Sequence, residues 1–416
     1  MDKTITVFLL ILLSLLTLMC SLCTNDLIVN AETIINAESV EDYNIAAANN
    51  AFAFDMYSKM KSNNENIFFS PYSIFSAIAI CYDGAEGTTK KQIANVFYFP
   101  LDKSILEVSL REMIDEINSE TDDYELETAN ALWIQKSYPI KKQYISNVDK
   151  YYSGKVEKLD FGGQPEKSRN IINEWVEEKT NDKIRDLVPE STINKDTRLI
   201  ITNAIYFNGK WLNGFDKQAT SNEKFYLSEK EEVTVDTMYM KRHLNYGENL
   251  NAKIIELPYN GDNLSMCIVL PNKNNIENFE NSFSARDYEK LKSKMDSKYE
   301  VKTWIPKFKF ETRTDLSSLL IEMGAEDAFY SGNFSGISEE NLIISNVIHQ
   351  AFVDVQEEGT EAAAATYVEM SVTVEYVKPE PPIREFKADH PFMFFIEDQR
   401  TGCILFMGKI EKPEYE

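Results

Sequence analysis

The stretch Glu357-Glu358-Gly359-Thr360-Glu361-Ala362-Ala363-Ala364-Ala365-Thr366 leads, through small residues, into a segment with a strand-like pattern. From Thr366 to Tyr376, Thr, Val, Met and Tyr occupy every second position. Such alternation predicts a half-buried strand. Yet Lys378-Pro379-Glu380-Pro381-Pro382 follows, with the composition of an exposed extended loop. The sequence therefore describes a segment that can occupy two places.

Composition indicates a globular protein. The chain has 416 residues, of which 43% are hydrophobic, enough for one large core or two modest ones. Its formal net charge is -24, whereas binding to nucleic acid or to an anionic membrane surface requires clustered Lys and Arg. We therefore expect no nucleic-acid partner.

The N-terminus has the pattern of a targeting signal or an anchor. Lys3 precedes an uncharged, Leu-rich run over residues 5–23, and the next charged residue is Asp26. Val29-Asn30-Ala31 then supplies the small side chains that a signal peptidase requires. We expect a signal peptide over residues 1–31, secretion, and a polar leader over residues 32–45. The alternative is an uncleaved segment that anchors the protein to a membrane.

The cysteines indicate no disulfide framework. Removal of a signal peptide leaves Cys81, Cys267 and Cys403, an odd number, each among apolar neighbours. We expect three buried free thiols.

Hydrophobic spacing places predicted helices mainly in the first half of the chain and predicted strands in the second. Helices are expected at 46–61, 74–82, 104–117 and 168–180, and strands at 199–207, 253–257, 265–270, 301–310, 392–396 and 404–407. Ser70 or Ser73 can cap the second helix. This distribution predicts an α+β fold with antiparallel sheets rather than repeated βαβ units.

The patterns typical of catalysis are absent from the sequence. The three histidines, His243, His349 and His390, form neither an HExxH motif nor a paired Cys/His spacing, so we expect no metal and no cofactor. There is no GxSxG elbow. The run from Gly84 to Lys90 lacks the Gly-Lys-Ser/Thr end of a phosphate loop, and we interpret it as a turn between helices.

Four motifs carry a family resemblance. They are Asn66-Ile67-Phe68-Phe69-Ser70-Pro71-Tyr72-Ser73 with Gly84-Ala85-Glu86-Gly87-Thr88-Thr89; Thr202-Asn203-Ala204-Ile205-Tyr206-Phe207-Asn208-Gly209-Lys210-Trp211; the Ala-rich stretch 357–366; and Asp389-His390-Pro391-Phe392 with Leu405-Phe406-Met407-Gly408. With these motifs in this order, the chain resembles the serpins. The resemblance implies one domain over residues 46–416, with three mostly antiparallel β-sheets surrounded by about eight to nine helices. Its hinge and exposed reactive loop span residues 357–386.

The resemblance implies an inhibitor of serine proteases and not an enzyme. The loop serves as a pseudo-substrate; after the protease has formed an acyl-enzyme, the freed hinge inserts as a central strand and traps the protease. The alternative is a non-inhibitory serpin that acts as a carrier, chaperone or storage protein. The small side chains of Ala362 to Ala365 favour the inhibitor. We expect a monomer that meets a serine protease, with papain-like cysteine proteases as further targets.

The hinge has a second interpretation on local propensity alone. Ala-rich sequence beside Glu favours a surface helix. If it instead inserts as a strand, Thr360, Ala362, Ala364 and Thr366 lie on the inner face, where no charge would be buried. The alternation after Thr366 and the four motifs together favour the strand.

The resemblance also assigns roles by motif. Ser70, Ser73, Asn203 and His349 match the shutter, a hydrogen-bonded cluster beneath the central sheet where that sheet must part. Trp211 matches the breach, the upper end of that sheet where the hinge enters. Lys307 is expected there as the partner of Glu357.

Two counts place the scissile bond differently. Counting forward from Gly359 at the usual family spacing reaches Thr373-Val374. Counting back from Phe386, at the start of the next strand, reaches Val377 or Lys378, because the loop is longer than in common relatives. The bond is therefore bounded to residues 373–378.

The candidate positions suit different proteases. Tyr376 would attract a chymotrypsin-like enzyme, and Lys378 a trypsin-like one, although Pro379 opposes cleavage after Lys378. Thr373 or Val377 would attract an elastase- or subtilisin-like enzyme. We favour Thr373.

Overall fold

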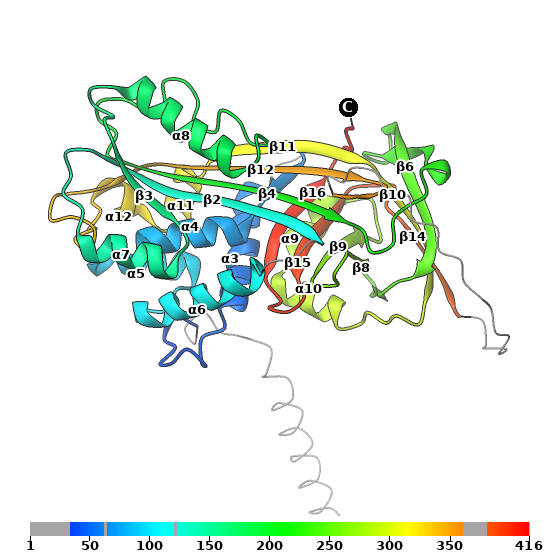
Figure 1. Ribbon diagram of the computed structural model, residues 1–416. Helices are drawn as coiled ribbons and strands as arrows, with labels where there is room; N and C mark the ends of the chain where they lie inside the picture. Colours follow the sequence, from blue (N-terminus) through cyan, green and yellow to red (C-terminus); the bar gives the residue numbers. More distant parts are fainter. Residues whose placement is uncertain (1–33, 62–64, 120–122, 361–380, 416) are drawn as a thin grey trace, which may run out of the picture.

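The computed structural model describes residues 34–61, 65–119, 123–360 and 381–415. Within them the chain forms ten α-helices, one 3-10 helix and three β-sheets of six, six and four strands. The mixed α+β class that the sequence predicts is confirmed, with one or two more helices than the resemblance implies. Figure 1 shows most of the helices toward one end of the molecule and the smallest sheet at the other.

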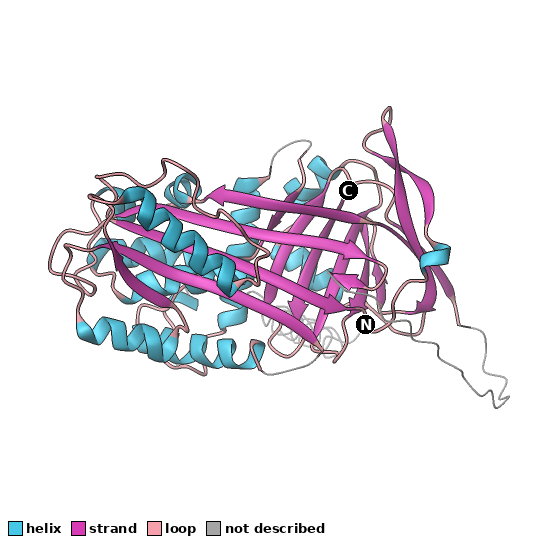
Figure 2. Ribbon diagram, turned by 45° about the horizontal axis from the view of Figure 1, so that its top comes forward, coloured by secondary structure: helices cyan, strands magenta, loops and turns pink. Residues whose placement is uncertain are grey.

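A six-stranded sheet, called here the central sheet, runs the length of the molecule (Figure 2). Its strands, in spatial order, are β11 (Phe308–Asp315), β12 (Ile344–Gln356), β13 (Gly359–Thr360), β4 (Leu199–Lys210), β2 (Tyr124–Gln135) and β3 (Lys155–Leu159). Most of β4 is buried, consistent with its run of apolar and β-branched residues.

The middle of the central sheet contains a parallel seam. β12 pairs directly with β4 from Ile344↔Leu199 to Ala351↔Ile205, whereas β2 pairs with β4 antiparallel. The short β13 lies between β12 and β4 only at the C-terminal ends of these two strands, where they diverge. Below β13 the seam is closed by direct strand pairing.

The second six-stranded sheet, called here the core sheet, packs behind the central sheet. Its strands are β1 (Ile67–Phe69), β16 (Ile404–Ile410), β15 (Phe392–Asp398), β9 (Leu264–Pro271), β8 (Ala252–Pro258) and β7 (Tyr246–Glu248). Aromatic stacking joins its strands: the Phe68 ring lies 5.3 Å from Phe406 and 5.7 Å from Phe394. Phe68 also meets Phe310 of the central sheet at 6.1 Å, so the two sheets share one core.

The third sheet, called here the end sheet, contains β14 (Ile383–Lys387), β10 (Glu300–Pro306), β6 (Glu232–His243) and β5 (Ser221–Tyr226). The predicted strand over 301–310 is wrong as one element, because β10 and β11 belong to different sheets. The chain changes sheets at Pro306 and Lys307. The N–H of Lys307 donates to Asp236 O at 2.8 Å, which holds it to the end sheet at this corner.

The helices cover the sheets on several sides. They are α3 (Ile45–Met60), α4 (Pro71–Asp83), α5 (Gly87–Phe97), α6 (Lys103–Ile117), α7 (Lys142–Tyr151), α8 (Pro165–Lys179), α9 (Ile276–Ser282), α10 (Ala285–Lys292), α11 (Ser317–Met323) and α12 (Glu326–Tyr330). α4 is buried along its whole length, and the side chain of Ser70 caps it by accepting the N–H of Ser73. α8 covers the outer face of the central sheet over a separate apolar cluster that includes Trp133 and Ile200 (Figure 1).

Other sequence predictions have clear outcomes. The four predicted helices correspond to α3, α4, α6 and α8. The turn predicted over residues 84–90 is only partly right, because α5 begins at Gly87 and only residues 84–86 connect it to α4. Cys81, Cys267 and Cys403 are buried free thiols, as predicted. Residues 32–45 were expected to form a polar leader, but the side chain of Ile34 in this segment is buried.

The apolar N-terminal run lies outside the described residues. Among the helices that the structure describes, none is long and apolar enough to cross a membrane.

Candidate functional site

The hinge begins inside the central sheet as a tight hairpin. β12 ends at Gln356, Glu357 and Glu358 form the turn, and Gly359 and Thr360 return antiparallel to β12 as β13. Gln356 pairs with Gly359, and Val355 with Thr360. On its other edge β13 pairs with the end of β4. The first two residues after the turn therefore already occupy the position of an additional strand.

Gly359 is required at this position by close backbone contact. A Cβ atom there would collide with the carbonyl of Gly209 and would lie 2.7 Å from the Cα of Lys210. The φ angle of Gly359 is 157°, at the edge of the region that side-chain-bearing residues avoid. A glycine thus lets the chain turn back into the narrow gap between β12 and β4.

Thr360 faces inward, on the side that the alternation predicts. It is only 1% exposed, and its hydroxyl lies 2.7 Å from the hydroxyl of Tyr259. Burial raises the pKa of Tyr259 well above its usual value, so this phenol remains protonated and able to donate. The Tyr259 ring stacks on Trp211 at 4.5 Å. The hinge therefore contacts a stacked aromatic pair through Thr360.

Trp211, directly after β4, binds the hairpin through two hydrogen bonds. Its backbone N–H donates to Glu358 O at 3.0 Å, and its indole Nε1–H donates to Gln356 O at 2.9 Å. These bonds satisfy carbonyls on both sides of the turn. The structure thus places Trp211 where the hinge enters the central sheet.

Glu357 is held by contacts from two sides. Lys307 Nζ lies 3.1 Å from its carboxylate, and the Thr220 hydroxyl, just after the 3-10 helix η1 (Lys217–Ala219), donates to it at 2.8 Å. Burial alone raises the pKa of the Glu357 carboxyl, but the Thr220 hydrogen bond and the Lys307 charge outweigh it and lower the pKa overall. Glu357 is therefore an anchored carboxylate. On the other side of the turn, Glu358 pairs with Lys217 at 2.6 Å.

The C-terminal segment completes the breach, a contribution that sequence reasoning missed. The Lys307 ammonium lies 4.2 Å from the centre of the Tyr415 ring, and the Tyr415 hydroxyl donates to Gln356 Oε1 at 3.2 Å. Lys309 N–H binds the carbonyl of Glu414 at 2.7 Å. An aromatic residue at the C-terminus was the available signal, but its position follows only from the fold.

The shutter residues come together beneath the seam. His349 of β12 and Asn203 of β4 face each other across it, with Nδ1 of His349 2.5 Å from Asn203 Oδ1. Asn203 also donates to Ser73. The Ser70 N–H donates to Nε2 of His349 at 3.2 Å, so Nε2 accepts and the ring proton sits on Nδ1. Burial lowers the pKa of His349 to about 3, which keeps it neutral at physiological pH.

A fifth shutter residue was not predicted. Asn130 of β2 accepts from Ser73 Oγ at 3.3 Å and from Asn203 Nδ2 at 2.5 Å. Asn130 reaches the shutter because β2 pairs with β4 in the register Asn130↔Asn203, although the two residues are 73 positions apart in the sequence. The shutter therefore ties three strands of the central sheet, β12, β4 and β2, to the start of α4.

The remaining loop predictions lie outside the described residues. These are the hinge residues after Thr360 and the candidate positions Thr373, Val374, Tyr376, Val377 and Lys378. The chain resumes with β14, which pairs parallel with β10 at the edge of the end sheet.

The described residues offer no metal-binding arrangement. No group of three or more His, Cys, Asp or Glu side chains among them could hold a metal ion. His390 contacts Asp389 at 2.9 Å and the carbonyl of Pro271 at 2.8 Å, where it fixes the chain between β14 and β15. The buried, neutral His349 is positioned as a structural contact across the seam.

Comparisons with known proteins agree with this architecture. The family model described as Serpin (serine protease inhibitor) matches residues 47–413. A Methanosarcina acetivorans protein described as an uncharacterized serpin-like protein is 61% identical over 389 residues, covering 92% of each chain. Human Serpin B4 is 37% identical over 391 residues, covering 89% of this chain and 99% of that protein. The crystal structure of uncleaved ovalbumin has a TM-score of 0.79 at 31% identity, over 89% of this chain and 100% of that one.

The chain therefore belongs to the serpin family. The activity by which the family model is described is inhibition of serine proteases and not catalysis, so the protein is not an enzyme.

Proposed function

We propose that this serpin inhibits serine proteases as a suicide pseudo-substrate. The observation that carries the proposal is the hairpin at Glu357 and Glu358, which already directs Gly359 and Thr360 into the gap between β12 and β4. Once the loop is cut, the residues after Thr360 continue along the same path. They insert as a full strand of the central sheet, in the manner of strand addition.

The chemical step belongs to the protease. Its serine oxygen bonds to the carbonyl carbon of the scissile peptide, the C–N bond breaks, and the amine on the C-terminal side leaves with a proton. The serpin remains attached through an ester. Insertion of the loop then moves the bound protease away from its docking position before water can hydrolyse that ester. The inhibitor is consumed by its own reaction.

Insertion is favourable because it adds strand pairing on two edges. If about a dozen loop residues each gain a net hydrogen bond of roughly 1 kcal/mol, the gain is on the order of 10 kcal/mol. The inner-face residues Thr360, Ala362 and Ala364 are small and uncharged, so no desolvated charge opposes the process. The intact protein is then held by a kinetic barrier and is not at its free-energy minimum.

The shutter and the breach supply that barrier. The bond between His349 and Asn203 crosses the seam and must break when β12 and β4 separate. The ion pair of Lys307 with Glu357 holds the turn in position. Such contacts stabilise the closed seam until cleavage frees the loop.

The proposed target is an elastase- or subtilisin-like enzyme that cuts after Thr373, in keeping with the forward count from Gly359. Tyr376, Val377 and Lys378 are the alternatives within the same window. We further propose that the protein acts outside the cell, supported by the run over residues 5–23 and the small residues Val29-Asn30-Ala31. N-terminal sequencing of the protein from the extracellular fraction tests the proposed secretion. A protein that stays with the cells and still carries residues 1–31 would contradict it.

One experiment tests the inhibitory function. The mature protein is incubated with chymotrypsin, trypsin, elastase and subtilisin, and the products are separated after boiling in detergent. We expect a covalent complex with at least one enzyme, and mass spectrometry of the released C-terminal peptide then gives the scissile bond. Cleavage by all four without a complex would contradict the proposal and favour a carrier, chaperone or storage role.

A matched pair of variants tests the strand assignment of the hinge. Thr360→Arg places a charge against Tyr259 on the buried face, which costs several kcal/mol, whereas Thr360→Ser keeps the hydroxyl contact. The arginine variant should be cut without forming complex, and the serine variant should inhibit. Equal complex yields would refute the assignment.

A further inference from the structure

Two segments of the chain carry the motif for N-linked glycosylation, an asparagine followed two positions later by serine or threonine, with no proline between them. They are Asn333-Phe334-Ser335, in the loop between α12 and β12, and Asn263-Leu264-Ser265, where β9 begins. So short a motif also occurs by chance, and its surroundings decide whether a transferase can use it. The attached sugar is bulky, so the asparagine amide and the hydroxyl must both be accessible at the surface.

Asn333 presents its amide at the surface. Its side chain is exposed, and that of Ser335 is partly exposed. Oδ1 of Asn333 accepts the backbone N–H of Ser335 at 3.2 Å, an Asx turn that leaves Nδ2 on the other side of the amide group. A Cβ atom at Gly87 would lie 3.5 Å from this Nδ2. Because residue 87 is a glycine, no side chain from that position covers the nitrogen.

The loop around Asn333 is held against the rest of the protein. The backbone N–H of Asn333 donates to the Thr89 hydroxyl at 2.9 Å, and its carbonyl accepts the N–H of Glu86 at 2.9 Å. Phe334, the middle residue of the motif, is buried in the hydrophobic core. The turn is therefore anchored by its backbone and its central side chain, while the amide of Asn333 faces outward.

The motif at Asn263 has the opposite surroundings. Leu264 and Ser265 are both buried, and Ser265 is only 2% exposed. The Ser265 hydroxyl donates to the carboxylate of Glu256 at 2.8 Å. In the folded protein a transferase cannot reach this hydroxyl. We therefore expect no modification at Asn263.

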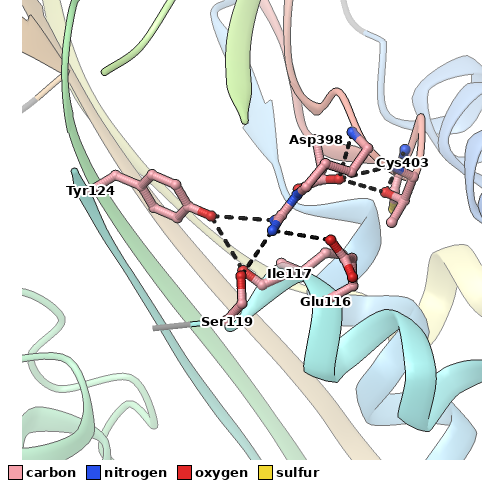
Figure 3. Close-up of polar contacts among 8 residues, drawn as sticks. Glu116, Ile117, Ser119, Tyr124, Asp398 and Cys403 are labelled. Atoms are coloured by element: carbon pink, nitrogen blue, oxygen red, sulfur yellow. Dashed lines mark hydrogen bonds and ion pairs between the residues drawn. The ribbon is translucent and has the colours of Figure 1, made fainter. Parts of the chain in front are cut away.

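Asn118 shows that exposure alone does not make an acceptor. It follows α6 and is exposed, but Ser119 comes directly after it, one position too early for the motif. The Ser119 hydroxyl moreover accepts a hydrogen bond at 2.8 Å from Arg400, in the turn between β15 and β16 (Figure 3). Asn118 is therefore an exposed asparagine that lacks the motif.

We propose that Asn333 is the attachment site of an N-linked oligosaccharide. The donor is an oligosaccharide linked to a lipid phosphate or pyrophosphate. Nδ2 of Asn333 bonds to C1 of the first sugar, the C1–O bond to the phosphate breaks, and the lipid phosphate leaves with the electron pair of that bond. One amide proton passes to a base of the transferase, and no atom is oxidised or reduced. The inference rests on the proposed secretion, because this motif is used in secreted chains.

A glycan at Asn333 lies far from the place where a protease first binds. Figure 1 shows α12 and α5, which flank Asn333, at the end of the molecule opposite β14 and the rest of the end sheet. β14 begins at Ile383, within the segment 357–386 predicted to contain the reactive loop. We therefore expect the glycan to leave the rate of protease inhibition unchanged.

The test is peptide mapping by mass spectrometry of the protein expressed from its full sequence in its own host. We expect the fragment that contains Asn333 to carry the mass of an oligosaccharide in the extracellular protein. Asn333→Gln and Ser335→Ala should each lose this mass completely, whereas Ser335→Thr should keep it. Asn263→Gln, the matched control at the buried motif, should also keep it. All four variants should inhibit proteases at the wild-type rate.

The outcomes separate the glycosylation site from the proposed secretion. Extracellular protein with an unmodified Asn333 would overturn the site and leave secretion standing. Protein retained with the cells but modified at Asn333 would support the site and contradict secretion alone. Retained protein with residues 1–31 still attached and Asn333 unmodified would overturn both. A glycan on Asn263 would overturn the argument from exposure. These results come from the wild-type chain, so they hold even if a variant does not fold.

Discussion

Replacing Gly359 by alanine tests whether the start of the hinge lies in the central sheet because glycine permits close backbone contact. The new Cβ would collide with the carbonyl of Gly209 and lie 2.7 Å from the Cα of Lys210, both backbone atoms that cannot rotate away. We expect β13 to leave the central sheet. The loss includes the Thr360 to Tyr259 hydrogen bond and the pairing with β12 and β4. About three hydrogen bonds at roughly 1 kcal/mol each give a cost on the order of 3 kcal/mol.

Hydrogen exchange measures this effect. A cost on the order of 3 kcal/mol lowers protection against exchange by roughly 100-fold in the peptide that spans the hinge. The fluorescence of Trp211 should change as well, because its indole binds Gln356 O and stacks on Tyr259. Since the inserted strand needs the same close approach, complex formation with a protease should fall in favour of simple cleavage.

Gly162→Ala is the control for the Gly359 variant. The atom nearest to an added Cβ there is Gln135 Nε2 at 3.5 Å, an ordinary contact. This control should retain wild-type exchange and inhibition. Undiminished protection of the hinge in Gly359→Ala would refute the steric argument.

Three further predictions concern the shutter, a buried carboxyl and the C-terminus. Because burial lowers the pKa of His349 to about 3, the unfolded chain binds more protons below pH 6.5; the free energy of unfolding should fall by roughly 1.4 kcal/mol per pH unit from about 6.5 towards 3. His349→Gln should lack this slope in chemical denaturation. Burial, and then the neighbouring Asp83, raise the pKa of Glu107 to about 7, so its contribution to stability is lost as pH rises from about 4.5 to 7. Glu107→Gln should accordingly stabilise the protein at pH 8 but not at pH 4, and a stabilisation equal at both values would contradict the assignment. Tyr415→Ala should lower the free energy of unfolding by about 0.5–1 kcal/mol by removing the ring over Lys307, whereas Tyr415→Phe should retain most of it.

Local sequence was sufficient to predict features that depend only on residues close together in the chain. The inward position of Thr360 follows from the two-residue period of a strand. The sequence offered Ser70 or Ser73 as the cap of α4 because a cap depends only on the next three residues, and the structure shows that Ser70 is the cap. The α+β class and the free thiols follow from similar local patterns.

Contacts that depend on register between distant segments could not be predicted. Asn130 joins the shutter only because β2 pairs with β4 at Asn130↔Asn203. Tyr415 reaches Lys307 only through the course of the chain after β16. The predicted strand over 301–310 failed for a similar reason, since a hydrophobic run does not show where a chain leaves one sheet for another.

A crystal structure of the loop-cleaved protein would test the central claim most directly. In the intact chain Ala351 and Ile205 are paired neighbours on β12 and β4. The proposed insertion predicts a continuous strand after Thr360 between them, which would raise the strand separation from about 4.8 Å to about twice that value. A cleaved chain in which Ala351 still pairs with Ile205, and the hinge still ends at Thr360, would contradict the proposed mechanism.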